Sequence, residues 1–255
     1  MKIVVLDAGH GGIDSGAVGN GLKEKDLTLE MVKMIGKGLV DNYSEVKVIY
    51  TRQTDVFIKL DDRSDIANKN NADLFVSVHI NAAGDELANG MEAFYFKDSK
   101  ATIITYNHIM NEIEKSAYKV NNRGTKIGNL SVLRNTKCPA VLTETLFITN
   151  KANSILLKNQ KFINDVCLGH IRGIATFLNL KENKLVNSPS PAPSIPQKSE
   201  PANWLKSGGE YLINDLGLDK NYWTWDRPIR AGELGAVLAK HEAHLRELIK
   251  NAKQD

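Results

Sequence analysis

Short strand-like segments alternate with longer helical patterns between residues 2 and 178 of this 255-residue chain. The strand-like segments are rich in β-branched and aromatic residues and cover residues 2–7, 47–52, 73–80, 90–96 and 140–145. The helical patterns carry apolar residues at three- and four-residue spacings and cover residues 27–42, 61–71, 101–119 and 153–178. Strands and helices that alternate in this way are typical of α/β domains. The pattern therefore predicts an α/β domain with a twisted, mostly parallel or mixed sheet flanked by helices.

A proline- and serine-rich segment interrupts the apolar periodicity between residues 183 and 202. Such a composition cannot build a hydrophobic core and favours extended backbone, so we expect a linker there. It would separate a first domain, residues 1–182, from a small helical C-terminal domain, residues 203–255. An apolar stripe at helical spacing supports the helical prediction for that last domain. The stripe consists of Leu234, Val237, Leu238, Leu245 and Leu248.

The charge and the hydropathy of the chain argue against two broad classes of partner. A net charge of +3 is too small to indicate nucleic-acid binding by itself. No segment approaches the roughly 18 consecutive apolar residues of a membrane-spanning helix, and the N-terminus begins on a strand pattern rather than on a signal peptide. We therefore expect no nucleic-acid partner, no membrane span, and a protein that stays in the cytoplasm after its synthesis.

The first predicted strand runs directly into a glycine-rich turn that contains a histidine, with the sequence DAGHGG at residues 7–12. A dinucleotide-binding fingerprint requires a glycine where this chain has Asp14, and no Gly-Lys-Ser/Thr triplet of a phosphate-binding loop follows the turn. A later motif, HEAH at residues 241–244, is one residue too short for the HExxH motif of zinc metalloproteases. A metal site and a plain tight turn remain as interpretations of the first motif.

Side chains of the kinds that bind metal ions lie at the ends of three predicted strands. His10 follows the first strand, His79 ends a central one, and Glu144 lies near the end of a late one. Glu24, just ahead of the first helical pattern, is a second carboxylate. Ligands of α/β sheets usually bind at the carboxyl ends of the strands, where these groups could meet. Two histidines and one carboxylate form a known catalytic zinc site, in which a second carboxylate can serve as the proton shuttle.

Each of these residues also has an ordinary structural explanation. His10 could be a turn residue, and His79 could be a hydrogen-bonded histidine at the end of an apolar strand. Glu24 could be a solvated charge near a helix start, and Glu144 could be an edge carboxylate or an ion-pair partner. The residue types alone leave these alternatives open. His170 lies within a helical pattern with no cluster around it, so we expect an ordinary helix residue there.

Four motifs in order resemble those of the zinc-dependent N-acetylmuramoyl-L-alanine amidases of the amidase-3 type. They are DAGHGG, EKDLTL, DLFVSVHINA and LSVLRNTKCPAVLTETLFITN. The resemblance covers residues 2–178 and implies one zinc ion per catalytic domain, held by His10, Glu24 and His79. It also implies that Glu144 is the catalytic acid and base. The fold of that family, a twisted and mostly parallel sheet flanked by helices, agrees with the alternation of strand and helix patterns.

The same resemblance bears on four further positions. Arg63 and Asn68 match positions where the family also carries Arg and Asn, so support of the site or substrate and a purely structural role are both open. Asn81 could hydrogen-bond a bound glycan or peptide. Many members follow the catalytic glutamate with a small residue and then Gly-Phe, whereas this chain reads ETLF. We therefore expect Leu146 to alter the local turn and the fit of the substrate.

The resemblance implies a peptidoglycan hydrolase that cleaves the amide bond between N-acetylmuramic acid and L-alanine of the stem peptide. A catalytic domain, a linker and a small C-terminal domain, without an export signal, are the layout of a phage endolysin that is released to a Gram-positive type of cell wall. The tail, residues 203–255, is similar to a surface-layer-homology repeat or another small helical module that binds a cell-wall polymer. It could instead form a homodimer.

Three alternative functions are also compatible with the sequence. A host autolysin or mother-cell lysin would use the same chemistry in a different biological setting. A zinc peptidase would cut within the stem peptide rather than at its first residue. A non-catalytic wall-binding protein could use the same fold without any hydrolysis.

Overall fold

The computed structural model describes residues 1–183 of the chain. The expected C-terminal domain, residues 203–255, and nearly all of the expected linker lie outside the described residues, so both stay predictions. Among the described helices, none combines the length and the apolar character needed to cross a membrane.

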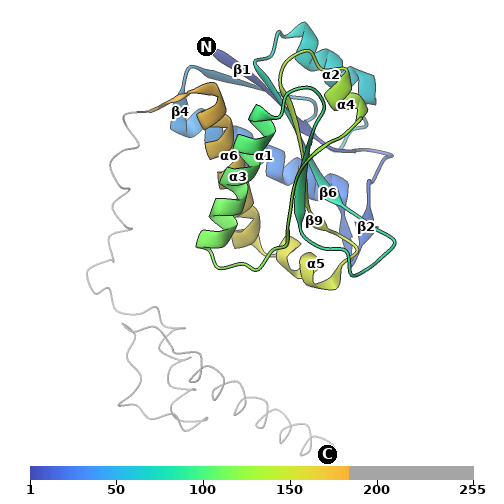
Figure 1. Ribbon diagram of the computed structural model, residues 1–255. Coiled ribbons are helices and arrows are strands. Elements are labelled where there is room, and N and C mark those ends of the chain that lie inside the picture. Colours follow the sequence, from blue (N-terminus) through green and yellow to red (C-terminus); the bar gives the residue numbers. More distant parts are fainter. Residues whose placement is uncertain (184–255) are drawn as a thin grey trace, which may run out of the picture. The chain divides into compact units, whose positions relative to one another are not determined.

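A six-stranded mixed sheet forms the centre of the described part (Figure 1). In spatial order its strands are β5 (Val46–Tyr50), β1 (Lys2–Ala8), β6 (Leu74–Asn81), β9 (Ala140–Phe147), β7 (Met91–Tyr95) and β8 (Asn122–Ile127). Neighbouring strands are parallel except β7 and β9, which are antiparallel. The prediction of a mostly parallel, mixed α/β sheet is therefore confirmed. Two short pairs complete the strands, β2 (Val18–Gly19) with β3 (Leu22–Lys23), and β4 (Tyr43–Ser44) with β10 (Lys181–Glu182).

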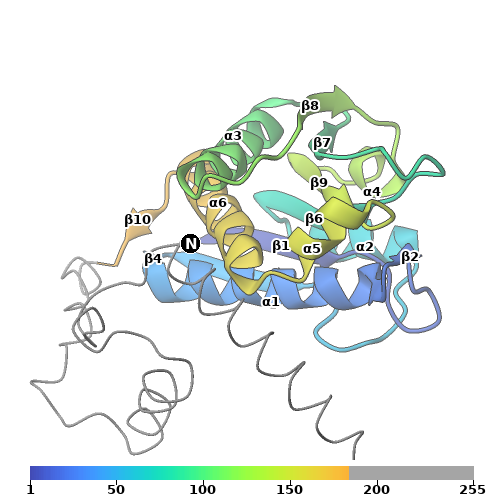
Figure 2. The same cartoon turned by 90° about the horizontal axis from the view of Figure 1, so that it is seen from below.

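Helices cover both faces of the sheet (Figure 2). One face packs against α1 (Glu24–Asn42), α3 (Lys100–Lys115) and α6 (Gln160–Leu178), and the other packs against α2 (Leu60–Lys69) and α4 (Ser131–Arg134). The alternation of side chains along each strand produces these two cores. In β1, for example, Val4 and Leu6 belong to the larger core while Val5 belongs to the smaller one. The smaller core leaves the carboxyl ends of the strands free to carry polar groups.

Several local features differ from the sequence prediction, among them the short helix α4, the helix boundaries after residue 150 and one strand of the main sheet. The helical pattern over residues 153–178 forms two helices, α5 (Lys151–Leu157) and α6, because the Asn159 side chain caps α6 by accepting a hydrogen bond from the Phe162 amide at 3.1 Å. Strand β8 was not predicted, because its sequence NRGTKI lacks an apolar alternation. As an edge strand it pairs only with β7, so tertiary pairing rather than local pattern defines it.

The imidazole of His170 is fully buried, unlike that of an ordinary helix surface residue. Its Nδ1 lies 2.9 Å from the Val166 carbonyl oxygen, and its Nε2 lies 3.0 Å from Oγ1 of Thr143 on β9. Because a carbonyl can only accept, Nδ1 donates and Nε2 accepts from the threonine hydroxyl, which satisfies both nitrogens of the neutral ring. Burial lowers the pKa of His170 to about 4.

We expect the folded protein to lose stability through His170 as the pH falls from 7 to 5. The unfolded chain binds a proton near the usual pKa of 6.5, whereas the folded chain does not bind it until about pH 4. His170→Gln should therefore remove about 2 kcal/mol of the pH-dependent loss, measured as the free energy of unfolding in urea at both pH values. His108→Gln, at a half-buried position of α3 where the ring contacts the Thr176 hydroxyl at 3.1 Å, is the control and should follow the wild type. If the free energy of unfolding fell equally in His170→Gln and in the wild type between pH 7 and pH 5, the lowered pKa of His170 would be contradicted.

Candidate functional site

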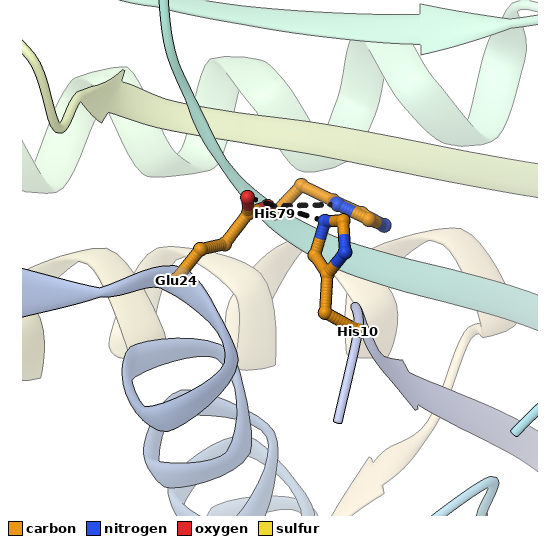
Figure 3. A group of neighbouring side chains, drawn as sticks. All are labelled: His10, Glu24 and His79. Carbon is orange, nitrogen blue, oxygen red and sulfur yellow. Dashed lines mark hydrogen bonds and ion pairs between the residues drawn. The ribbon is translucent and has the colours of Figure 1, made fainter. Parts of the chain in front are cut away.

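The three predicted metal ligands come together at the carboxyl ends of β1 and β6 (Figure 3). His10 follows β1, Glu24 begins α1, and His79 lies near the end of β6. The Glu24 carboxylate lies between the two rings, with Oε2 3.1 Å from His10 Nε2 and Oε1 3.0 Å from His79 Nδ1. One potential ligand atom from each residue lies within 4.8 Å of the others. The structure thus assembles a donor set that could hold a metal ion.

Two glycines make room for these side chains. A Cβ atom on Gly9 would lie 2.4 Å from Cε1 of His79, and one on Gly16 would lie 2.6 Å from Cδ2 of His10. Any side chain at either glycine would therefore displace an imidazole. His10 itself has a φ of 61°, a left-handed conformation that is uncommon outside glycine and concentrated at functional sites. The glycine-rich turn therefore provides close approach to the rings as well as a bend in the backbone.

The electrostatics of this cluster favour a cation. Glu24 is buried and also accepts hydrogen bonds from the backbone amides of Ala17 and Ile80. Burial would raise the pKa of Glu24, but its hydrogen bonds to the two imidazoles lower it. Burial opposes the charged form of both imidazoles, yet Glu24 raises the pKa of His10 and of His79. A carboxylate held ionised beside two ring nitrogens is a site prepared for positive charge.

Asp14 orients His10 and was not predicted as a site residue. Its Oδ2 lies 2.9 Å from His10 Nδ1, so that nitrogen can donate while Nε2 faces Glu24. A carboxylate that accepts from one ring nitrogen fixes the orientation of the other, as in the outer shell of many metal sites. The spacing of four residues from His10 could have drawn attention to Asp14. In the sequence, Asp14 stands out only because it occupies the third glycine position of a dinucleotide-binding fingerprint.

Glu144 lies beside the cluster, on the same face of the sheet as His79. The two residues are Cα partners across the parallel pairing of β6 and β9. Oε2 of Glu144 is buried and has no hydrogen-bond partner among the described residues. Burial raises the pKa of Glu144 to about 7. An orphaned carboxylate oxygen with this pKa is suited to exchange a proton with a bound molecule near neutral pH.

A cavity of about 290 Å³ opens in front of these groups. Its polar lining includes His10, His79 and Glu144, and its apolar lining includes Phe57 and Leu130. A concave site with apolar walls and a few convergent polar groups is typical of a binding site for a small molecule or for part of a polymer. The cavity thus places the candidate metal site and the orphaned carboxylate against one ligand-sized space.

A buried ion pair lies beneath the histidine turn. Arg63 Nη1 lies 2.7 Å from Asp7 Oδ1, and Arg63 Nη2 donates to the His10 carbonyl oxygen at 2.8 Å. Asp7 also accepts hydrogen bonds from the hydroxyls of Thr51 and Ser77, each at 2.7 Å. Arg63, which belongs to α2, therefore stabilises the position of the His10 backbone. Of the two roles left open for Arg63, these contacts favour support of the site.

The two asparagines named by the sequence make other contacts. The Asn68 side chain donates to the Asn135 carbonyl and accepts from the Lys137 amide, so it links α2 to the loop after α4. The Asn81 amide donates to Glu92 Oε1 at 2.6 Å. Neither asparagine lines the cavity described above. Glu92 could not be predicted as a functional residue from the sequence, because a glutamate within a short strand carries no motif.

Leu146 occupies an irregular position just after Glu144. The register shifts from His79 opposite Glu144 to Asn81 opposite Phe147, which leaves an extra residue in β9. Leu146 has a φ of 63°, which glycine adopts freely and a leucine adopts only with strain. Its side chain is completely buried in the larger core. Burial of the Leu146 side chain thus offsets the strain of its backbone, at a position where many members of the resembled family carry glycine.

Comparisons with known proteins agree with the fold and identify the family. The profile of the Amidase_3 family, described as N-acetylmuramoyl-L-alanine amidase, matches residues 4–176. An endolysin of Bacillus phage SPP1 is 48% identical, over 74% of this chain and 70% of that protein. The N-acetylmuramoyl-L-alanine amidase CwlM of Bacillus licheniformis is 38% identical, over 72% of this chain and 71% of that protein.

A solved structure leads to the same family. The catalytic domain of CwlV, an N-acetylmuramoyl-L-alanine amidase from Bacillus (Paenibacillus) polymyxa var. colistinus, superimposes with a TM-score of 0.66 and 34% identity, over 71% of this chain and 100% of that one. The fold and the donor set define an α/β domain with a candidate metal centre at the carboxyl ends of its strands. The chain belongs to the Amidase_3 family of N-acetylmuramoyl-L-alanine amidases.

We expect Asp7→Asn to destabilise the fold, because it leaves the Arg63 guanidinium buried without a counter-charge. The expected loss in free energy of unfolding is about 3 kcal/mol, measured by urea denaturation. Asp41→Asn removes an exposed ion pair with Lys37 and is the matched control, with an expected change of less than about 1 kcal/mol. Equal stability of the two variants would show that the buried pair does not support the turn.

Proposed function

We propose that this protein is a zinc-dependent amidase that hydrolyses the bond between N-acetylmuramic acid and L-alanine in peptidoglycan. The observation that carries the proposal is the orphaned Glu144 carboxylate beside the cluster of His10, Glu24 and His79, in a chain of the amidase family. A purely structural glutamate at this position would be expected to have a hydrogen-bond or ion-pair partner for its buried oxygen.

His10, Glu24 and His79 would hold the zinc ion. Two imidazoles and one carboxylate are a donor set of catalytic zinc sites, which keep one further position open. When bound, zinc lowers the pKa of a water molecule towards 7 and stabilises negative charge on a carbonyl oxygen. The ionised Glu24 and the orienting contact from Asp14 fit this role, because both favour a cation at the unprotonated nitrogen of His10.

Glu144 would transfer the proton during hydrolysis. As a general base, its carboxylate takes a proton from the water that attacks the amide carbon, and as a general acid it returns that proton to the nitrogen that leaves. The C–N bond breaks, so the products are a lactyl carboxylate on the sugar and a free amine on L-alanine. A pKa of about 7 for Glu144 allows both directions of transfer near neutral pH.

The biological setting that we propose is that of an endolysin, released from the cytoplasm to a Gram-positive type of cell wall. The similarity to the endolysin of Bacillus phage SPP1 supports this setting. In this proposal residues 1–182 are the catalytic domain, residues 183–202 are a linker, and residues 203–255 bind a cell-wall polymer or form a homodimer. A host autolysin or mother-cell lysin would carry out the same reaction.

Glu144→Gln should abolish most hydrolysis while leaving the fold and the zinc content intact. We expect the rate of hydrolysis to fall at least about 100-fold, because the glutamine side chain cannot accept the proton of the attacking water. Activity is measured on purified cell walls, with mass spectrometry of the products and zinc content by elemental analysis. Glu114→Gln, which changes an exposed glutamate on α3, is the control and should keep full activity.

The products distinguish the proposed reaction from its alternatives. Muramic lactyl groups and free N-terminal L-alanine are expected from the wild type. Cleavage only within the stem peptide would instead indicate a zinc peptidase, and wall binding without any product would indicate a non-catalytic protein. A fully active, zinc-loaded Glu144→Gln variant would overturn the role of Glu144.

A further inference from the structure

The sheet register continues the row of functional side chains two strands beyond Glu144. Glu144 on β9 is the Cα partner of His79 on one side and of Glu92 on β7 on the other. On the next strand the register shifts between Met91 and Ala93, so that Arg123 lies in a bulge of β8 beside Glu92. Adjacent strands are about 5 Å apart, so the backbone at Arg123 lies about 10 Å from that at Glu144. The row therefore runs away from the candidate metal site.

Arg123 is held in a defined position at the end of this row. Its Nε donates to Glu92 Oε2 at 3.1 Å, and its guanidinium carbon lies 4.9 Å from the centre of the Phe147 ring. Phe147 belongs to β9, so the guanidinium is directed back over the sheet rather than out from its edge. Bulges commonly re-aim a side chain next to an active site. The Arg123 side chain is 32% exposed, whereas that of Glu92 is 6% exposed.

The cluster around Glu92 has an excess of positive charge. Glu92 accepts hydrogen bonds from the Asn81 amide, from Arg123 and from Lys126, so its two oxygens are already engaged. One carboxylate is thus shared between two cations. The terminal nitrogens of Arg123 have no hydrogen-bond partner among residues 1–183. A planar guanidinium that is stacked, oriented and free at its terminal nitrogens matches the two oxygens of a carboxylate.

We propose that Arg123, assisted by Lys126, binds a substrate carboxylate on the peptide side of the cleaved bond. This inference rests on the proposed amidase function. In this proposal the carboxylate is that of the residue after L-alanine. Successive Cα atoms are 3.8 Å apart, so that group lies roughly 7 Å from the cleaved amide. A long arginine side chain that leans over β9 can meet it there, while the cavity lined by Phe57 and Leu130 remains on the other side of Glu144. Arg123 is then a specificity-determining residue and takes no part in the proton transfer.

The test compares two synthetic substrates that differ in a single group. One is a muramoyl-L-alanyl peptide whose next residue carries a free carboxylate, and the other carries the corresponding carboxamide. Arg123→Gln should lower kcat/KM for the first substrate about tenfold, mainly through KM, because a charge-assisted hydrogen bond of the bound state is lost. The carboxamide substrate should change by less than about twofold, since it makes no such ion pair. Arg123→Lys, which keeps the charge without the planar fork, should give an intermediate loss.

Arg172 provides a matched control on the opposite face of the sheet. It pairs with the buried carboxylate of Glu112, at 2.5 Å, and Lys115 is the second cation of that cluster. Arg172→Gln therefore removes the same kind of ion pair far from the site and should leave both substrates unaffected. Thermal unfolding of the two glutamine variants reports whether they have lost similar stability.

The outcomes separate this inference from the proposed function. A loss confined to the carboxylate substrate is the expected result. Equal losses on both substrates, or none on either, would overturn the assignment of Arg123 while leaving the amidase function in place. A wild type that cleaves neither substrate would overturn the proposed function and, with it, the carboxylate site.

Discussion

The buried ion pair between Asp7 and Arg63 is the interaction on which the rest of the site depends. Asp7 lies at the end of β1 and accepts hydrogen bonds from Thr51, which follows β5, and from Ser77, which lies within β6. Its ion-pair partner, Arg63, belongs to α2. The same guanidinium holds the carbonyl of His10. Removing two charges from water is costly, so the pair persists only with its full set of partners. That requirement ties three strands and one helix to a single position of the histidine turn.

Three unfavourable features of the fold lie at the candidate site or directly beside it. His10 and Leu146 both have left-handed backbones, and the Glu144 carboxylate has a buried oxygen without a partner among the described residues. Each of these costs stability, and the two hydrophobic cores on either side of the sheet offset the cost. Register shifts lie on either side of the paired strands β9 and β7, one between β6 and β9 and one between β7 and β8. Backbone strain and a buried carboxylate therefore occur where this otherwise regular sheet presents polar side chains to a ligand.

Sequence reasoning succeeded where a residue type is unusual for its local context. A histidine in a glycine-rich turn and a histidine at the end of an apolar strand both stand out, and the ordered motifs connected them with Glu24 and Glu144. It failed where the context is ordinary. Strand β8 has no apolar alternation, and its Arg123 looks like any surface arginine. Glu92 and Asp14 are common residue types at unremarkable positions, and their roles come from partners distant in sequence or from the fold of a turn.

The sequence by itself determined the class of fold, because the alternation of strand and helix patterns is a local property of side-chain periodicity. It also determined the candidate metal ligands and the carboxylate beside them, through motifs whose order along the chain matches one family. Only the tertiary structure decided how these groups act together. The distance between Glu24 and each imidazole, the missing partner of Glu144 and the position of Arg123 beside Glu92 all depend on strand register. Register is set by packing and by bulges between segments far apart in the chain, and no local pattern records it.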